Sequence, residues 1–178
     1  LDGWYILMND IVLQNNMEGA AEELDGEDGT KVFAYNKPVI GLQNNAFAGV
    51  FDGNGFTISN LKFKQLTDEY IGLFGGNNGT IRNLVLEHEI WKNSAGQNQG
   101  FRNKSGALVG LNRGTIENCY VKATVMGCQN NQWRASGAIA GYATGASKIV
   151  NCFVEVDWVD LFDGAGAIKS GGAVTGVK

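Results

Sequence analysis

The chain has 178 residues with 26 Gly and one Pro, and its formal net charge is −4. An apolar fraction of 44 % excludes a disordered chain. The sequence has no run of about 18 apolar residues, so it predicts no insertion into a membrane. The acidic balance argues against nucleic acid as a partner, because such proteins usually carry a basic excess. These properties favour one Gly-rich, mostly β domain over residues 1–178.

The first distinctive region is residues 14–46, which fit no repeat and hold six carboxylates in the first half. We interpret this region as an acidic insertion or end cap, with a short helix over residues 17–24 that Asn16 caps. Residues 25–30 resemble a calcium loop but lack its ligand spacing and its distal Glu. A cation site in this region is the alternative.

Four copies of one pattern follow, each with Gly, alternating apolar residues and a shared Asn. They cover residues 47–63, 71–86, 105–121 and 136–154, and a partial copy covers residues 171–178. Alternation with a period of two predicts half-buried strands, and the Gly and Asn runs predict turns between them. The shared Asn tolerates the left-handed backbone conformation that a bend requires.

One such copy cannot bury its apolar face alone, so the copies are expected to stack. Each strand would then pair with its equivalent in the next copy, which predicts an all-β, right-handed parallel β-helix (a solenoid) of about four to five coils. Equivalent side chains would lie in rows about 4.8 Å apart. The predicted rows are an amide ladder of Asn60, Asn83, Asn118 and Asn151, a core row of Leu61, Leu84, Cys119 and Cys152, and a core row of Phe63, Leu86, Val121 and Val154.

The three cysteines, Cys119, Cys128 and Cys152, have no C-x-x-C spacing, which excludes the usual zinc and redox motifs. In a stacked row, the Cβ vectors of Cys119 and Cys152 would be parallel, and a disulfide disfavours that geometry. The sequence therefore predicts reduced thiols, and it predicts no metal site.

The loops that follow the third strand of each copy are expected to project from one side of the stack. They cover residues 64–70, 87–104, 126–135 and 157–165, and three of them carry a Trp. Flat aromatic faces beside amide and guanidinium donors suit sugar rings. The sequence thus predicts a glycan-binding site made of Trp91, Lys92, Arg102, Trp133, Arg134 and Trp158. The alternative is that these rings shield the core strands.

No catalytic residues and no cofactor are predicted. His88 is the single histidine and is expected to be solvated or satisfied in a loop, since no second His or nucleophile accompanies it. The exposed strand positions mix Lys, Arg and Glu and lack the paired carboxylates of a glycosidase. Asp157, Asp160 and Asp163 are interpreted as the polar edge of a turn.

Three phrases, Gly72-Leu-Phe-Gly75, Gly106-Ala-Leu-Val-Gly110 and Gly137-Ala-Ile-Ala-Gly141, each precede a T-I-x-N type strand. They resemble the repeats of GLUG-motif proteins, and the resemblance covers residues 4–13 and 47–176. Residues 143–146 of the fourth copy depart from the Asn-x-Gly turn of the others. GLUG repeats occur in bacterial surface and secreted proteins, including adhesin-like proteins and non-catalytic regions of immunoglobulin-A-cleaving proteases.

The resemblance implies an extracellular or cell-surface module, without catalysis, whose partner is a glycan or a host surface protein. Two other functions stay open: a carbohydrate-active β-helix enzyme, such as a polysaccharide lyase or hydrolase, and a structural subunit that stacks end to end into a filament. Because neither end carries a terminal signature, we expect the chain to be a fragment of a longer polypeptide.

Overall fold

A computed structural model describes residues 1–13, 22–25, 31–35, 38–63, 69–90, 104–126, 135–159, 170–172 and 175–177. Throughout this part of the chain the regular secondary structure is β-strand. No helix long and apolar enough to cross a membrane occurs among these residues. The strands form four parallel sheets and one antiparallel hairpin, so the all-β class and the parallel pairing are confirmed.

Two five-stranded sheets form the larger part of the molecule. The first has the order β1 (Trp4–Ile6), β5 (Val50–Asp52), β9 (Thr80–Arg82), β13 (Thr115–Glu117) and β17 (Lys148–Val150). The second, which we call the long-strand sheet, has the order β2 (Ile11–Val12), β6 (Thr57–Phe63), β10 (Val85–Ile90), β14 (Tyr120–Met126) and β18 (Phe153–Val159).

Two four-stranded sheets complete the parallel structure. One contains β7 (Tyr70–Ile71), β11 (Lys104–Gly106), β15 (Ala135–Gly137) and β19 (Ser170–Gly172). The other contains β8 (Phe74–Asn77), β12 (Val109–Asn112), β16 (Ala140–Ala143) and β20 (Thr175–Val177). The hairpin pairs β3 (Glu22–Asp25) with β4 (Lys31–Ala34).

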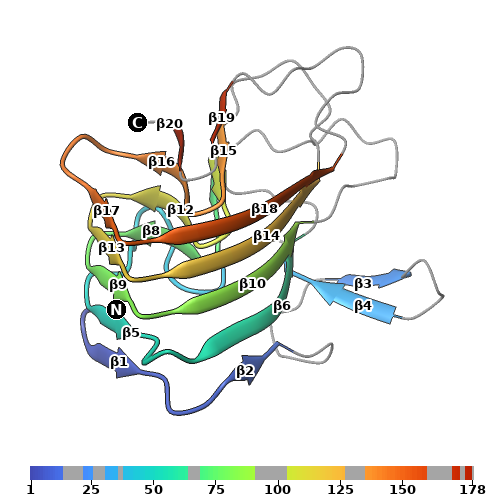
Figure 1. Ribbon diagram of the computed structural model, residues 1–178, viewed down its shortest axis with the longest axis horizontal. Helices are drawn as coiled ribbons and strands as arrows, with labels where there is room; N and C mark the ends of the chain where they lie inside the picture. Colours follow the sequence, from blue (N-terminus) through green and yellow to red (C-terminus); the bar gives the residue numbers. More distant parts are fainter. Residues whose placement is uncertain are drawn as a thin grey trace.

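Outside the hairpin, successive strands of the chain enter different sheets, and each parallel sheet contains every fourth strand. Each of the sets β7–β10, β11–β14 and β15–β18 contributes one strand to each of the four parallel sheets, and we call each set a tier. Figure 1 shows strands of successive tiers side by side, most clearly β6, β10, β14 and β18. In chain order, each long strand is followed by a strand of the sheet of β7: β6 by β7, β10 by β11, β14 by β15 and β18 by β19.

Alternation along the strands decides which side chains enter the core. In β14, Val121 and Ala123 are buried, whereas Lys122 is exposed. The row of Leu86, Val121 and Val154 is confirmed, because β10, β14 and β18 pair in that register. Each Å² of apolar surface that these rows remove from water stabilises the fold by about 25 cal/mol. This burial is the main source of stability of the paired strands.

The row of Leu84, Cys119 and Cys152 is also confirmed. The Tyr120 amide donates to the Leu84 carbonyl, and the Phe153 amide makes the same bond to the Cys119 carbonyl, both at 2.9 Å. Leu84 and Cys119 are buried, and Cys152 is half-buried. These three residues therefore occupy equivalent places in successive tiers.

The predicted alignment of the first copy is wrong. Asp52 pairs with Arg82, and the Gly53 amide donates to the Arg82 carbonyl, so Gly53 occupies the place of Asn83. Asn60 lies instead inside β6, where the register shifts. Two bends of similar composition follow one another here, at residues 53–55 and at Asn60, and tertiary pairing selects the first as the corner.

This shift moves three residues out of their predicted rows. Leu61 pairs with His88 and so does not join the row of Leu84. Phe63 pairs with Ile90 and so does not join the row of Leu86. The Asn60 amide group donates to the Leu13 carbonyl at 2.6 Å, so Asn60 is not part of the amide ladder.

The predicted left-handed bends are confirmed at every shared Asn, whose φ angles lie between 52° and 61°. The amide ladder itself is present between Asn118 and Asn83, where Nδ2 donates to Oδ1 at 3.4 Å. Asn83 Nδ2 also donates to the Asp52 carboxylate at 2.9 Å, one residue before Gly53, which holds the equivalent place in the first copy. Asn118 is exposed, and Asn83 and Asp52 are half-buried; we call these three residues the exposed corner.

A second amide pair, at Asn77 and Asn112, was predicted only as turn sequence. Both side chains are fully buried, and Asn77 Nδ2 donates to Asn112 Oδ1 at 2.8 Å. Each Oδ1 also accepts the backbone N–H of the Gly two residues later, Gly79 or Gly114. We call these four residues the buried corner.

The region 14–46 differs from its prediction in two ways. Residues 22–24 belong to strand β3, where a helix was expected, and Figure 1 shows the hairpin extending away from the end of β6. Residues of its second half also join the stack: Tyr35 bridges Phe63, and Ile40 bridges Phe74. The calcium-loop residues 26–30 lie outside the described part of the chain.

Candidate functional site

The predicted glycan site falls largely outside the described residues. Trp91, Lys92, Arg102, Trp133 and Arg134 all lie there. Trp158 was predicted in a loop, but it lies in β18, in register with Val125 of β14. Asp157 is likewise an exposed strand residue and not a turn edge, whereas Asp160 and Asp163 are outside the described residues. Strand β18 extends through Asp157 and Trp158 because it pairs with β14 as far as Val159.

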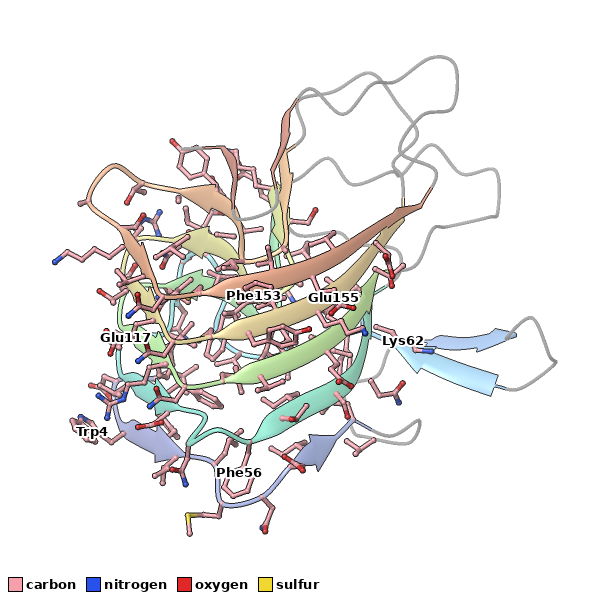
Figure 2. All side chains as sticks on the ribbon, in the orientation of Figure 1. Trp4, Phe56, Lys62, Glu117, Phe153 and Glu155 are labelled. Carbon is pink, nitrogen blue, oxygen red and sulfur yellow. The ribbon has the colours of Figure 1, made fainter. Side chains whose placement is uncertain are left out.

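The described residues offer a different candidate: the outer face of the long-strand sheet. Alternation places two rows of side chains there, next to one another. One row holds Val85 and two aromatic residues, Tyr120 and Phe153, and we call it the aromatic row. The other, the charged row, is Glu87, Lys122 and Glu155. Figure 2 shows Phe153 and Glu155 along β18 on this face.

Tyr120 and Phe153 form a stacked aromatic pair. Their ring centroids are 5.7 Å apart and their planes differ by 8°. Phe153 is 67 % exposed, because β18 is the last described strand of its sheet. One ring face is therefore covered by Tyr120, and Phe153 presents a large apolar surface to solvent.

Polar contacts fix the side chains beside this pair. Lys122 Nζ lies 2.8 Å from Glu155 Oε1, and the Tyr120 hydroxyl donates to Glu155 Oε2 at 2.8 Å. Hydrogen bonds from Lys122 and Tyr120 lower the pKa of Glu155, while the same carboxylate raises the pKa of Tyr120 and of Lys122. The ordinary charge states thus hold on this face at neutral pH.

A depression of about 300 Å³ lies on the same sheet. It is lined by Asn60, Glu87, His88, Lys122 and Thr124. Amide, ammonium, carboxylate and hydroxyl groups together offer donors and acceptors for a ligand rich in hydroxyls. The bend at Asn60, where the register of β6 shifts, helps to form this depression.

His88 was predicted to be solvated or satisfied in a loop, and this prediction is wrong. It lies in β10, is 5 % exposed, and packs against Phe63 with ring centroids 5.3 Å apart. Neither ring nitrogen has a hydrogen-bond partner among the described residues. Burial lowers the pKa of His88 to about 3, so the ring is neutral and belongs to the core.

The outer face of the neighbouring sheet carries a second exposed aromatic residue, Trp4. Trp4 is 80 % exposed, and the Arg82 guanidinium lies 5.8 Å from its ring centroid. Arg82 in turn binds Asp52 at 2.9 Å. Hydrogen bonds from Asn83, the Asn54 amide and Arg82 lower the pKa of Asp52. Figure 2 shows Trp4 on β1, far along the molecule from Phe153.

Sequence reasoning identified exposed charged positions on the strands but missed the aromatic row beside them. Tyr120 and Phe153 each occupy the first position of a strand, which is a weak signal until the strands are paired. A comparison of the rows in register would have found them, since both residues follow the shared Asn by two positions.

No family model, curated protein or solved structure matches this chain.

Proposed function

We propose that this protein is a non-catalytic β-helix module that binds a carbohydrate on the outer face of its long-strand sheet. The tiers would form a right-handed parallel β-helix, because right-handed crossovers between parallel strands are strongly preferred. The resemblance to GLUG repeats supports a bacterial, extracellular or cell-surface setting, with a glycan or a host surface protein as partner.

The observation that carries the carbohydrate proposal is the exposed Phe153 ring beside the fixed polar row. Sugar rings present apolar C–H faces together with many hydroxyls, so they pack on aromatic surfaces and bond to side groups. Glu155 and Lys122 are already held by each other and by Tyr120. Such pre-organisation reduces the entropy cost of binding.

The same contacts favour binding over cleavage. A glycosidase needs one carboxylic acid with a raised pKa beside a second, ionised carboxylate. Here the pKa of Glu155 is lowered by its hydrogen bonds, and Lys122 separates it from Glu87 in the register. These contacts therefore support a catalytic role for this face less well than a binding role.

The test is an array of neutral and uronic-acid oligosaccharides, followed by titration calorimetry of the best binder. Phe153→Ala and Lys122→Ala should each weaken binding about tenfold, which equals about 1.4 kcal/mol. Trp4→Ala is the matched control, because it removes an even more exposed aromatic ring from the neighbouring sheet. Absence of any binder, or loss of binding in the control alone, would contradict the proposal.

One observation favours a second function, end-to-end stacking. The exposed large apolar side chains of the strands lie in β1 and β2 at one end and in β17 and β18 at the other. They are Trp4, Tyr5, Ile6 and Val12, and Val150 and Phe153. In the register of the tiers, Val150 of one copy would meet Ile6 of the next. Sedimentation at rising protein concentration tests this: assembly that Ile6→Lys abolishes would support it, and a monomer throughout would exclude it.

A further inference from the structure

The two described cysteines adopt the same conformation in successive tiers. Cys119 Sγ contacts the Glu117 carbonyl at 3.3 Å and the Ile81 carbonyl at 3.9 Å. Cys152 Sγ contacts the Val150 carbonyl at 3.3 Å and the Ile116 carbonyl at 3.8 Å. Ile81 and Ile116 are themselves paired, so these contacts are equivalent.

Equivalent contacts imply that the two sulfur atoms are displaced from each other by about one interstrand spacing, which is about 4.8 Å. A disulfide needs its sulfurs about 2.05 Å apart. Thiolate–metal bonds are about 2.3 Å long, so a linear S–metal–S bridge spans about 4.6 Å. The spacing therefore fits a bridging metal ion and does not fit a disulfide.

We propose that Cys119 and Cys152 bind one soft, two-coordinate metal ion of charge +2 between their sulfur atoms, in the manner of Hg(II). Thiolates select soft ions over Mg²⁺ or Ca²⁺. The described residues contain no group of three or more His, Cys, Asp or Glu placed to hold a metal, so this pair offers two protein ligands and no more. That limits the site to ions that accept two-coordination.

Burial agrees with this assignment. Cys119 is 2 % exposed, whereas Cys152 is half-buried and gives the ion a route from solvent.

With mercuric chloride the binding step is balanced: two thiols and one HgCl₂ give one S–Hg–S bridge and two HCl. The product carries no net charge. A neutral complex suits a largely apolar row, since burying an uncompensated charge is costly.

The experiment titrates Cys128→Ser protein with mercuric chloride and follows ultraviolet thiolate–mercury absorbance and the count of remaining thiols. One equivalent should complete the absorbance change, block both thiols and raise Tm, with the protein still monomeric by size exclusion. Cys119→Ser and Cys152→Ser, each in the same background, should lose the bridge and leave one mercury per single thiol. Circular dichroism checks that these variants fold.

Three results would overturn the proposal: an end point at two equivalents, one free thiol after the first equivalent, or cross-linked dimers. Rapid formation of a Cys119–Cys152 disulfide with oxidised glutathione would also overturn it, because the sulfurs would then lie too close. The unaltered chain gives an independent check, since one equivalent should block two of its three thiols whether or not any variant folds.

Discussion

The buried corner and the exposed corner both contain a pair of asparagines from the same two tiers, yet they differ in what surrounds them. Asn77 and Asn112 are fully buried and bond at 2.8 Å, while Asn83 and Asn118 bond at 3.4 Å on the surface. Water competes with the second bond and not with the first. The comparison shows that similar sequence spacing can specify either a structural interior contact or a surface bend.

The largest expected effect is in the buried corner, at Gly114. A Cβ there would lie 2.1 Å from the Gly79 carbonyl oxygen, so Gly114→Ala should lower the free energy of unfolding by about 3 kcal/mol. Gly145→Ala is the matched control, because no described atom lies within 4 Å of its Cβ position. Urea unfolding of both variants measures the difference, and equal losses would contradict the close packing of tiers.

The next effect compares the two asparagine pairs directly. Asn77→Ala leaves a buried amide with one bond fewer, which should cost about 2–3 kcal/mol. Asn83→Gly keeps the left-handed backbone at φ 52° and removes a surface side chain, so it should cost less than about 1 kcal/mol. Thermal and urea unfolding report both values. A larger loss of unfolding free energy at Asn83 would mean that the exposed corner contributes more to stability than the buried corner.

His88 sharpens the comparison, because it is buried like Asn77 but has no hydrogen-bond partner among the described residues. Its native pKa of about 3 lies below the ordinary value of 6.5, so the unfolded chain binds the proton first as pH falls. Stability should therefore fall between pH 6.5 and pH 3, by about 2 kcal/mol from pH 7 to pH 5.

His88→Leu should remove that part of the pH dependence and raise stability at pH 5, since Leu61 and Ala123 flank this position. The measurement is the difference between the unfolding free energies of the variant and the parent at pH 5 and at pH 7. A difference that does not change with pH would contradict this prediction, because it would mean that His88 binds a proton equally well in the folded and unfolded chains.

The smallest expected effect extends the buried corner by one tier. Asn112 Nδ2 is buried without a partner in the described part of the chain, and Ala143 follows Asn112 in the register. Ala143→Asn should supply an acceptor and add about 1 kcal/mol to the free energy of unfolding. Ala143→Leu has similar volume without an acceptor, so it should give no gain. An equal gain from both would indicate filling of space.

The candidate face was less predictable from sequence than the rows of the core. Alternation of apolar residues identified Leu86, Val121 and Val154 as one inward-facing row, because the sequence signal and the structural cause are the same. Nothing comparable marked Tyr120, Phe153, Lys122 and Glu155 as neighbours, since strands more than 30 residues apart bring them together.

By itself, the sequence determined the all-β class, the parallel stacking of tiers, the left-handed Asn bends and the shared place of Leu84, Cys119 and Cys152. These follow from local rules: strand periodicity, the tolerance of Asn for positive φ, and the repeat of both. Tertiary structure alone decided the register of the first copy, the burial of His88 and which asparagines are interior. Each of these depends on which strand lies beside it, and pairing across tiers selects among local alternatives that the chain offers with nearly equal propensity.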